Sequence, residues 1–558
     1  MEERRPKQKL NKQGTLSWLY QVAGRGKWEI LLLIVLCSLQ SAISVIFALA
    51  MKAVVDAAVL GDRKDFFFKL FLLGLLMVLQ LLLAAMIRRE EERSKAKLEN
   101  KFKGRLYQGI LTRDYASLSK IHSGELLNRL TGDVLVVANQ ITEILPAVIS
   151  MVVKLVGAAG VLLVLDLRFA LIFLLGGILM LLVTYAFRKV MKRLHKEVQE
   201  ADGKARSYLQ ETIQNILVIR SFGKENQTVE EANEKLEEHK QVRMKRNAFY
   251  VLCNAGLSLV MKGGYFLGVI WGGYGILTRS LTYGTLTAVL SLVGQIQAPF
   301  ANISGYLPRF YSMIASAERL REVEDLPEDA GLHRKSQEEC KKLYEDLSSI
   351  EIKDLQFTYP EGVMAIKDKS FSIKKGDFIA ITGKSGIGKS TLLKLLLGVY
   401  QPDFGSLTLV LKDGKSQALS ARDRGLFSYV PQGNFLLSGT ITEGITYGQA
   451  SNVDEERLEQ ALRLSCATDF VNDLPEGRNS TLGEGGRGLS EGQTQRIALA
   501  RAIYSKAPIL LLDESTSALD AETEKKVLEN LKEQTDQTVL IVTHRKAALE
   551  VCDQVLHF

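Results

Sequence analysis

Cysteine is scarce in this chain, which has five cysteines among 558 residues. They are scattered along the sequence without the short spacing that metal-binding cysteines share. They are Cys37, Cys253, Cys340, Cys466 and Cys552. We therefore expect free thiols and no structural disulfide.

An internal repeat and a cleavable targeting peptide are also absent. No segment recurs in a way that would put two copies of one architecture into the chain. The leading residues are acidic and basic in turn and lack a short apolar core with a small-residue cleavage site. Neither sign of charge dominates, with 71 basic and 63 acidic residues and a net charge of +8. This balance gives no reason to expect a nucleic-acid partner.

The first half of the chain is rich in long apolar runs. Six of them meet the roughly 20-residue length that a helix needs to cross a bilayer. They lie near residues 28–58, 66–87, 146–165, 169–187, 249–277 and 284–303. The basic start and two long, charged connections, 88–144 and 188–248, hold most of the Lys and Arg of this half, which predicts that they and both termini are cytoplasmic. Before the first run, Leu16, Trp18 and Tyr20 suit a short helix at the membrane interface.

A glycine-rich string in the second half fits the pattern G-x-x-x-x-G-K-[ST]. It consists of Gly383, Lys384, Ser385, Gly386, Ile387, Gly388, Lys389 and Ser390, followed by Thr391. Such glycines let backbone N–H groups turn inward around phosphate oxygens, Lys389 reaches the β- and γ-phosphates, and the Ser390 hydroxyl can ligate Mg²⁺. A strand pattern precedes the string and a helix pattern follows it. A purely structural turn has the same local pattern, so the string alone leaves both readings open.

A second motif favours the phosphate-binding reading. Residues 509–513 form a short apolar run, typical of a strand buried on both faces, and the run ends in Asp513. Ligands bind at that edge of an α/β sheet. Asp513 can hold the shell of a Mg²⁺ ion and Glu514 can polarise an attacking water. Together the two motifs predict ATP hydrolysis.

From about residue 348 to its end, the chain resembles the nucleotide-binding domain of the ATP-binding cassette (ABC) family. The most specific match is residues 489–493, Leu-Ser-Glu-Gly-Gln, which resemble the family signature. The resemblance implies that Ser490, Gly492 and Gln493 contact ATP held by the P-loop of a second subunit, at a helix N-terminus. The family more often has Gly at the position of Glu491, a change that is common among its exporters.

Other family landmarks match in order. Tyr359 corresponds to the ring that stacks on adenine, Gln432 to the Mg²⁺-sensing glutamine, and His544 to the switch histidine that contacts the γ-phosphate. Asp520 ends a Ser-Ala-Leu-Asp loop that communicates between the two sites, and residues 481–484 resemble an exporter loop that touches the membrane domain. Singly, each residue has an ordinary structural alternative. Their joint order predicts Glu514 and His544 as catalytic residues. The predicted Mg²⁺ ligands are Ser390, Gln432 and Asp513.

The membrane half resembles the ABC exporters as well. Residues 121–133 are similar to the first intracellular loop of that group and residues 208–222 to the second, where short helices lie against the ATPase domains. The implied fold is multidomain: an all-α membrane domain of six transmembrane helices with long cytoplasmic extensions, then an α/β P-loop ATPase domain. We place the boundaries at 1–323 for the membrane domain, 324–347 for a polar linker and 348–558 for the ATPase domain. The family usually continues past the histidine for longer than this chain does to Phe558.

Polar residues within the spans indicate a substrate path, because burying them against lipid is costly. Lys154 and Lys262 fall near the middle of the third and fifth spans, and Gln295 and Gln297 lie in the sixth. A cavity with these groups favours substrates with an anionic or peptide-like group. The alternative is that the lysines bond to backbone or reach an interface.

The resulting hypothesis is an ATP- and Mg²⁺-dependent exporter working by alternating access as a homodimer, because one membrane half and one ATPase need a second copy. The predicted location is a bacterial inner membrane, with membrane lipid as a further partner. Peptides, amphipathic drugs and lipids all remain possible substrates. A lipid flippase, an importer on the exporter fold, one subunit of a heterodimer, and an ATP-gated channel or regulator are the alternatives.

Overall fold

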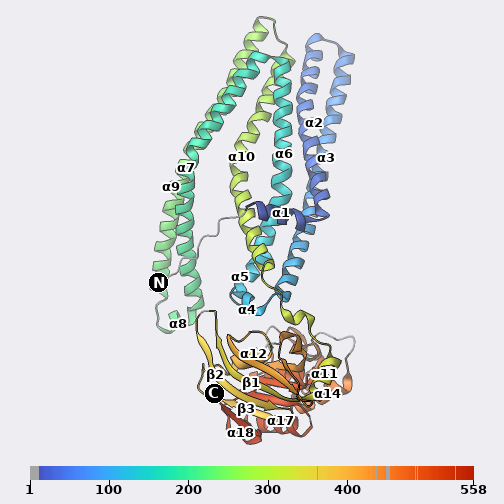
Figure 1. The fold of residues 1–558 in the computed structure, drawn as a ribbon. Helices are drawn as coiled ribbons and strands as arrows, with labels where there is room; N and C mark the ends of the chain where they lie inside the picture. Colours follow the sequence, from blue (N-terminus) through green and yellow to red (C-terminus); the bar gives the residue numbers. More distant parts are fainter. Residues whose placement is uncertain are drawn as a thin grey trace. The chain divides into compact units, whose positions relative to one another are not determined.

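The computed structural model describes residues 12–360, 362–433, 436–447, 453–483, 486, 488–534 and 536–558. It leaves out most side chains in 168–188 and 298–307, and that of residue 257. The chain divides into two compact units (Figure 1). The first runs to Leu106 and resumes over Leu127–Arg321, and the second combines Tyr107–Leu126 with Glu322–Phe558. The basic start, residues 1–11, lies outside the described residues.

Long helices make up the first unit because the apolar runs of the sequence leave no polar breaks within a span. They are α1 (Lys12–Ala23), α2 (Gly26–Leu60), α3 (Arg63–Thr112), α6 (Val134–Leu165), α7 (Leu167–Gln214), α9 (Glu225–Leu277) and α10 (Tyr283–Glu324). Short segments lie between them: α4 (Tyr115–Leu118), α5 (Ser123–Asn128), the π-helical turn Arg129–Asp133 and α8 (Ile216–Ser221). Helix α2 ends at Gly61, whose φ of 75° closes the helix with a left-handed cap.

Four segments among the described residues are long and apolar enough to cross a membrane: α2, α3, Ser123–Leu165 and α9. The predicted fourth and sixth spans fall on α7 and α10, where many side chains lie outside the described residues. Helix α2 packs along α6, and α7 along α9. A cluster of buried side chains joins α2, α6 and α10 through residues such as Ala48, Ala158 and Leu292.

The second unit is built on two main sheets. A parallel sheet has the strand order β11 (Gln554–His557), β3 (Phe378–Thr382), β10 (Thr538–Val542), β9 (Ile509–Asp513) and β6 (Phe427–Val430). Every residue of β3, β9 and β10 is buried, as the apolar runs predict for strands covered on both faces. An antiparallel sheet orders β2 (Met364–Lys374), β1 (Leu347–Thr358), β4 (Phe404–Leu411) and β5 (Ser416–Ala418). A two-stranded ribbon pairs β7 (Gly439–Thr440) with β8 (Thr481–Leu482).

Helices complete the second unit on both sides of the parallel sheet. They are α11 (Gln337–Asp346), α12 (Lys389–Leu396), α13 (Ile441–Thr446), α14 (Glu455–Leu464), α15 (Thr468–Asn472), α16 (Glu491–Tyr504), α17 (Ala521–Gln534) and α18 (Lys546–Val551). Helix α11 falls within the residues that we predicted as a linker. A capping box between Ser336 and Glu339 starts it, and its Cys340 and Tyr344 are buried in the core beside β1.

The segment Tyr107–Leu126 also belongs to this unit. Its Asp114 N–H donates to Pro327 O at 2.9 Å, and Thr112 O accepts from the Asp329 N–H at 3.0 Å. The Asp114 side chain caps α4 by accepting from the Ser117 N–H. Tyr115 then meets the ring of Tyr400, with centroids 6.1 Å apart. Helix α4 is therefore held by contacts within its own unit.

Candidate ATP site

The glycine-rich string forms the turn between β3 and the N-terminus of α12. Gly386 and Gly388 have positive φ values of 80° and 102°. A Cβ on Gly388 would lie 2.2 Å from Ala365 O, so only glycine fits there. Lys389 Nζ donates to Gly383 O at 2.8 Å and Lys384 O at 3.0 Å, which keeps its ammonium within the curve of the loop. The loop thus combines a helix N-terminus with an enclosed cation, the arrangement that binds phosphate.

Asp513 ends β9 directly beside this loop and is 2% exposed. Ser390 Oγ donates to its Oδ1 at 2.7 Å, and the Tyr429 hydroxyl donates to its Oδ2 at 3.0 Å. A carboxylate and a hydroxyl that converge in this way are oxygen donors of the kind that Mg²⁺ takes together with substrate phosphates and water. The predicted ligands Ser390 and Asp513 are therefore brought together.

Tyr429 is a residue that our sequence reasoning missed. It stands three positions before Gln432 in Tyr-Val-Pro-Gln, where only the glutamine was assigned a role. Burial, with the neighbouring Asp513 carboxylate, raises the pKa of Tyr429, so the hydroxyl stays protonated and remains a donor.

Glu514 follows Asp513 in a strained backbone conformation. Its φ is +50°, in the left-handed region that costs a non-glycine residue of order 1–3 kcal/mol. Gln432 Nε2 donates to Glu514 Oε2 at 2.8 Å. Strand β10 pairs in parallel with β9 so that Val542 stands opposite Asp513, which brings His544 to the same edge of the sheet as Glu514. The two predicted catalytic residues therefore follow neighbouring strands.

The signature residues begin α16. Ser490 and Gln493 form a capping box, in which Gln493 Oε1 accepts from the Ser490 N–H at 2.8 Å and Ser490 Oγ accepts from the Gln493 N–H at 3.3 Å. Gly492 packs against the loop after β9, because a Cβ there would lie 2.9 Å from Ala518 O. The predicted loop residue Asp520 accepts from the Thr523 N–H at 2.9 Å at the start of α17.

Two further residues that the sequence did not single out bond to that loop. One lies in α16 and the other follows β10. Gln495, one turn into α16, accepts from the Ala518 N–H at 3.0 Å. Arg545, next to His544, donates from Nη1 to Thr516 O at 2.8 Å and to Leu519 O at 2.6 Å. The signature helix and the histidine loop are thus joined through residues 516–519.

Tyr359 lies beside the P-loop helix. Its hydroxyl is 2.9 Å from Thr391 Oγ1, and its ring meets Tyr400 edge-on with centroids 5.5 Å apart. In the predicted exporter loop, residues 481 and 482 form β8, and Glu484 lies outside the described residues.

In the first unit, the four predicted substrate residues lie on three helices: Lys154 on α6, Lys262 on α9, and both glutamines on α10. Gln295 bonds Ser44 through both ends of its amide, at 3.1 and 3.0 Å. Gln297 donates to Met261 O at 2.8 Å, next to Lys262. Lys154 lies one turn before Ala158, which is buried with α2 and α10. The two glutamines are therefore hydrogen-bonded to the neighbouring helices α2 and α9, and Lys262 is exposed.

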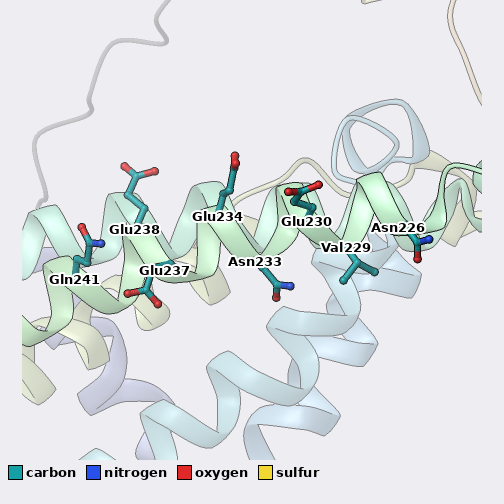
Figure 2. A pocket seen from close by; sticks show the side chains of 8 residues that line it. All are labelled: Asn226, Val229, Glu230, Asn233, Glu234, Glu237, Glu238 and Gln241. Atoms are coloured by element: carbon teal, nitrogen blue, oxygen red, sulfur yellow. The ribbon is translucent and has the colours of Figure 1, made fainter.

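An open groove runs along the lower part of α9 and contains none of the predicted residues (Figure 2). Its lining is Asn226, Val229, Glu230, Asn233, Glu234, Glu237, Glu238 and Gln241. All eight come from one helix, so the groove offers a row of acidic and amide side chains without an enclosing second wall.

Comparison with known proteins identifies two family regions. Residues 30–300 match the ABC transporter transmembrane region, and residues 366–517 match the ABC transporter ATPase region. An ATP-dependent lipid A-core flippase of Photobacterium profundum is 30% identical over 462 residues, 81% of this chain and 76% of that protein. A protein of the same name from Saccharophagus degradans is 31% identical, over 78% of this chain and 72% of that protein.

Other relatives have different names. A fatty acid ABC transporter ATP-binding/permease protein of Mycobacterium bovis is 29% identical, over 78% of this chain and 68% of that protein. Among solved structures, a bacterial Atm1-family ABC exporter with ATP bound superimposes with a TM-score of 0.76 at 21% identity, covering 96% of this chain and 94% of that one. The last match establishes the likeness of fold.

Proposed function

Because this chain belongs to the ABC transporter family and is an integral membrane ATPase of the exporter type, we propose that it exports an amphipathic, anionic substrate as a homodimer. Two ATP molecules close the pair of ATPase domains, the membrane helices open outward, and hydrolysis resets them. The conformational work comes from the tighter binding of ATP to the closed dimer. The observation that carries this proposal is the convergence of Lys389, Ser390, Asp513 and Glu514 at one edge of the parallel sheet.

In this mechanism the residues of the chain bind the nucleotide and activate water. Lys389 and the P-loop amides bind the phosphates, and Tyr359 stacks on adenine. Ser390, Gln432 and Asp513 would hold Mg²⁺, which would neutralise phosphate charge when bound. Glu514 orients the attacking water and takes up its proton, while His544 contacts the γ-phosphate. Ser490, Gly492 and Gln493 of one copy close over the ATP of the other.

The proposal of a homodimer has two supports. The described part of this chain contains Glu514, His544, Gln432 and the signature residues, so nothing in it marks a degenerate half. Helix α8 and the residue that follows it also expose apolar side chains that need a partner: Leu217 is 78% and Phe222 74% exposed. Burying such surface contributes roughly 25 cal/mol per Å². A second copy supplies an ATPase domain for this tip.

The proposed substrate class follows from four polar side chains within the membrane helices. Lys154 and Lys262 provide positive charge, and Gln295 and Gln297 provide amides, at a depth where a charge costs energy unless it has a function. Relatives carry names that refer to lipid A-core and to fatty acid. We therefore favour a lipid-like molecule with an anionic group over a cationic drug or a neutral peptide.

The arrangement in the membrane completes the proposal. We propose residues 1–323 as the membrane domain, 324–347 as the segment that links the domains, with its helix α11 packed in the core beside β1, and 348–558 as the ATPase domain. The concentration of Lys and Arg in the long connections and the bacterial relatives support a bacterial inner membrane with both termini in the cytoplasm.

The first test is ATPase activity in lipid nanodiscs, wild type beside Glu514→Gln, with anionic lipids, cationic drugs and small peptides. We expect anionic lipids to stimulate hydrolysis, and the Glu514→Gln variant to lose at least about 100-fold of the rate because the water loses its base. Stimulation by cationic drugs alone would refute the substrate class. Absence of turnover in the wild type would refute an active homodimer.

The lysines are tested in the same assay. Lys154→Ala with Lys262→Ala should abolish the stimulation but leave the basal rate, because neither residue belongs to the ATPase unit. Lys52→Ala is the control, since Lys52, like Lys154, is half-buried in a span but lies beside Gly284, at the start of α10. Equal stimulation in the double variant and the control would contradict the proposed cavity.

A further inference from the structure

The Asp513 carboxylate is held at both of its oxygens by residues of different elements. Ser390, at the start of α12, bonds Oδ1 at 2.7 Å, and Tyr429, in β6, bonds Oδ2 at 3.0 Å. With Asp513 2% exposed, solvent has little access to orient the carboxylate. Its rotation is therefore set by these two donors.

The position of Tyr429 follows from the sheet. Strand β6 pairs in parallel with β9, and the register places Tyr429 opposite Leu511 and Val430 opposite Leu512. The tyrosine side chain therefore starts two residues before the end of β9 and reaches along it to Asp513. Three residues later, Gln432 bonds Glu514 at 2.8 Å. The end of β6 and the residues after it thus bond both adjacent acids at the end of β9. The Tyr429 hydroxyl bonds Asp513, and the Gln432 amide bonds Glu514.

We propose that Tyr429 is a positioning residue for the metal site: its hydroxyl holds Oδ2 of Asp513 so that Oδ1 faces Ser390, the other residue that would hold Mg²⁺. This inference rests on the Mg²⁺ site proposed above. Without the hydroxyl the carboxylate turns more freely, and Mg²⁺ must then order it on binding. The variant should therefore bind ATP more weakly when Mg²⁺ is present, and its affinity for ATP without Mg²⁺ should not change.

The test compares nucleotide affinity with and without the metal, on the full chain in nanodiscs and in a Glu514→Gln background that stops hydrolysis. The readout is the ratio of the ATP dissociation constant in EDTA to that in excess Mg²⁺. Tyr429→Phe should lower this ratio about tenfold, as expected for the loss of one hydrogen bond to a charged group, with the value in EDTA unchanged within about twofold.

Tyr344→Phe is the matched control. Tyr344 is a buried tyrosine of the same unit, whereas Tyr429 is half-buried, and the Tyr344 hydroxyl bonds Asp536 O at 3.0 Å and Thr538 Oγ1 at 2.9 Å, away from the P-loop residues. This variant should leave the ratio unchanged. An equal fall in both variants, an unchanged ratio in Tyr429→Phe, or an equal loss of affinity with and without Mg²⁺ would overturn the proposal.

A double-mutant comparison separates the tyrosine from the metal site itself. Asp513→Asn should lower the ratio more than Tyr429→Phe does, and adding Tyr429→Phe to it should cause no further fall. A further fall of full size would show that Tyr429 acts without Asp513 and would refute the positioning role. If Mg²⁺ had no effect on the parent, the metal site and this inference would both be refuted, whereas a normal response in the parent and in Tyr429→Phe refutes the inference alone.

Discussion

Two short helices, α4 and α8, lie within the two long charged connections and differ in their surroundings (Figure 1). Helix α4 is fixed within its own compact unit by backbone bonds to Pro327 and Asp329 and by the ring of Tyr400. Leu217 of α8 and Phe222, which follows the helix, are exposed over most of their surface. Helix α4 therefore has its contacts within its own unit, whereas α8 leaves apolar surface exposed, which we propose a second copy covers.

We expect the largest effect from charged substitutions at the exposed apolar side chains of α8 and of the residue after it. Leu217→Asp with Phe222→Asp should lower substrate-stimulated ATPase by roughly tenfold or more, because charged groups replace the apolar anchors of an interface. Thermal stability of the isolated protomer should not change, since both side chains are exposed there.

Val229→Asp is the control for this change, because Val229 is 58% exposed on the neighbouring helix α9, within the acidic groove (Figure 2). It adds one negative charge to an exposed apolar site, where the α8 variant adds two. Equal activity in the α8 variant and the control would remove the distinction between α4 and α8.

A smaller effect is expected at the helix that is already fixed. Tyr115→Ala should destabilise the ATPase unit by about 1 kcal/mol, the magnitude of one aromatic pair, and lower its melting temperature by a few degrees. Tyr107→Ala, at a tyrosine of similar exposure in the same segment, is the comparison. The measurement is differential scanning calorimetry. Equal melting temperatures in the two variants would mean that the Tyr400 contact does not hold α4.

The smallest effect concerns pH. Asp329, whose backbone bonds Thr112, also receives two hydrogen bonds from Arg424 at 2.7 and 3.1 Å. Burial by itself would raise the pKa of Asp329, but the Arg424 and Gly331 hydrogen bonds outweigh it and lower the pKa below its usual range. A lowered folded-state pKa stabilises the fold above the unfolded value near 4, and this contribution is lost as the pH falls through the folded pKa.

We therefore expect the stability of the wild type to fall below about pH 4 partly through Asp329. Asp329→Asn should be less stable than the wild type at pH 7, and the difference should shrink as the pH falls through that window. Melting temperatures from pH 7 to pH 3 measure this. A constant difference across that range would show that the Arg424 pair does not anchor this segment.

The ATPase motifs and the membrane runs could be predicted because their signals are local. The glycines of 383–388 need positive φ values that few other residues tolerate, and a buried strand such as β9 shows as an unbroken apolar run. The amphipathic helix α11 was harder to see, because Cys340 and Tyr344 are its buried anchors among mostly charged residues. The mostly polar composition of residues 324–347 predicts a linker, so the helix is not evident from composition.

By itself, the sequence determined that this is an ABC transporter and where polar groups interrupt the spans, and it predicts which residues bind phosphate, since each depends on residues close together in the chain. Only the tertiary structure decided that Tyr429 bonds Asp513, that Gln495 and Arg545 hold one loop, and that Tyr115 packs on Tyr400. Those contacts join segments far apart in sequence, and the register of parallel strands and the docking of α4 bring them within hydrogen-bonding or packing distance. No single segment of the sequence predicts which distant strand it pairs with, because the strand order is set by packing over the whole sheet.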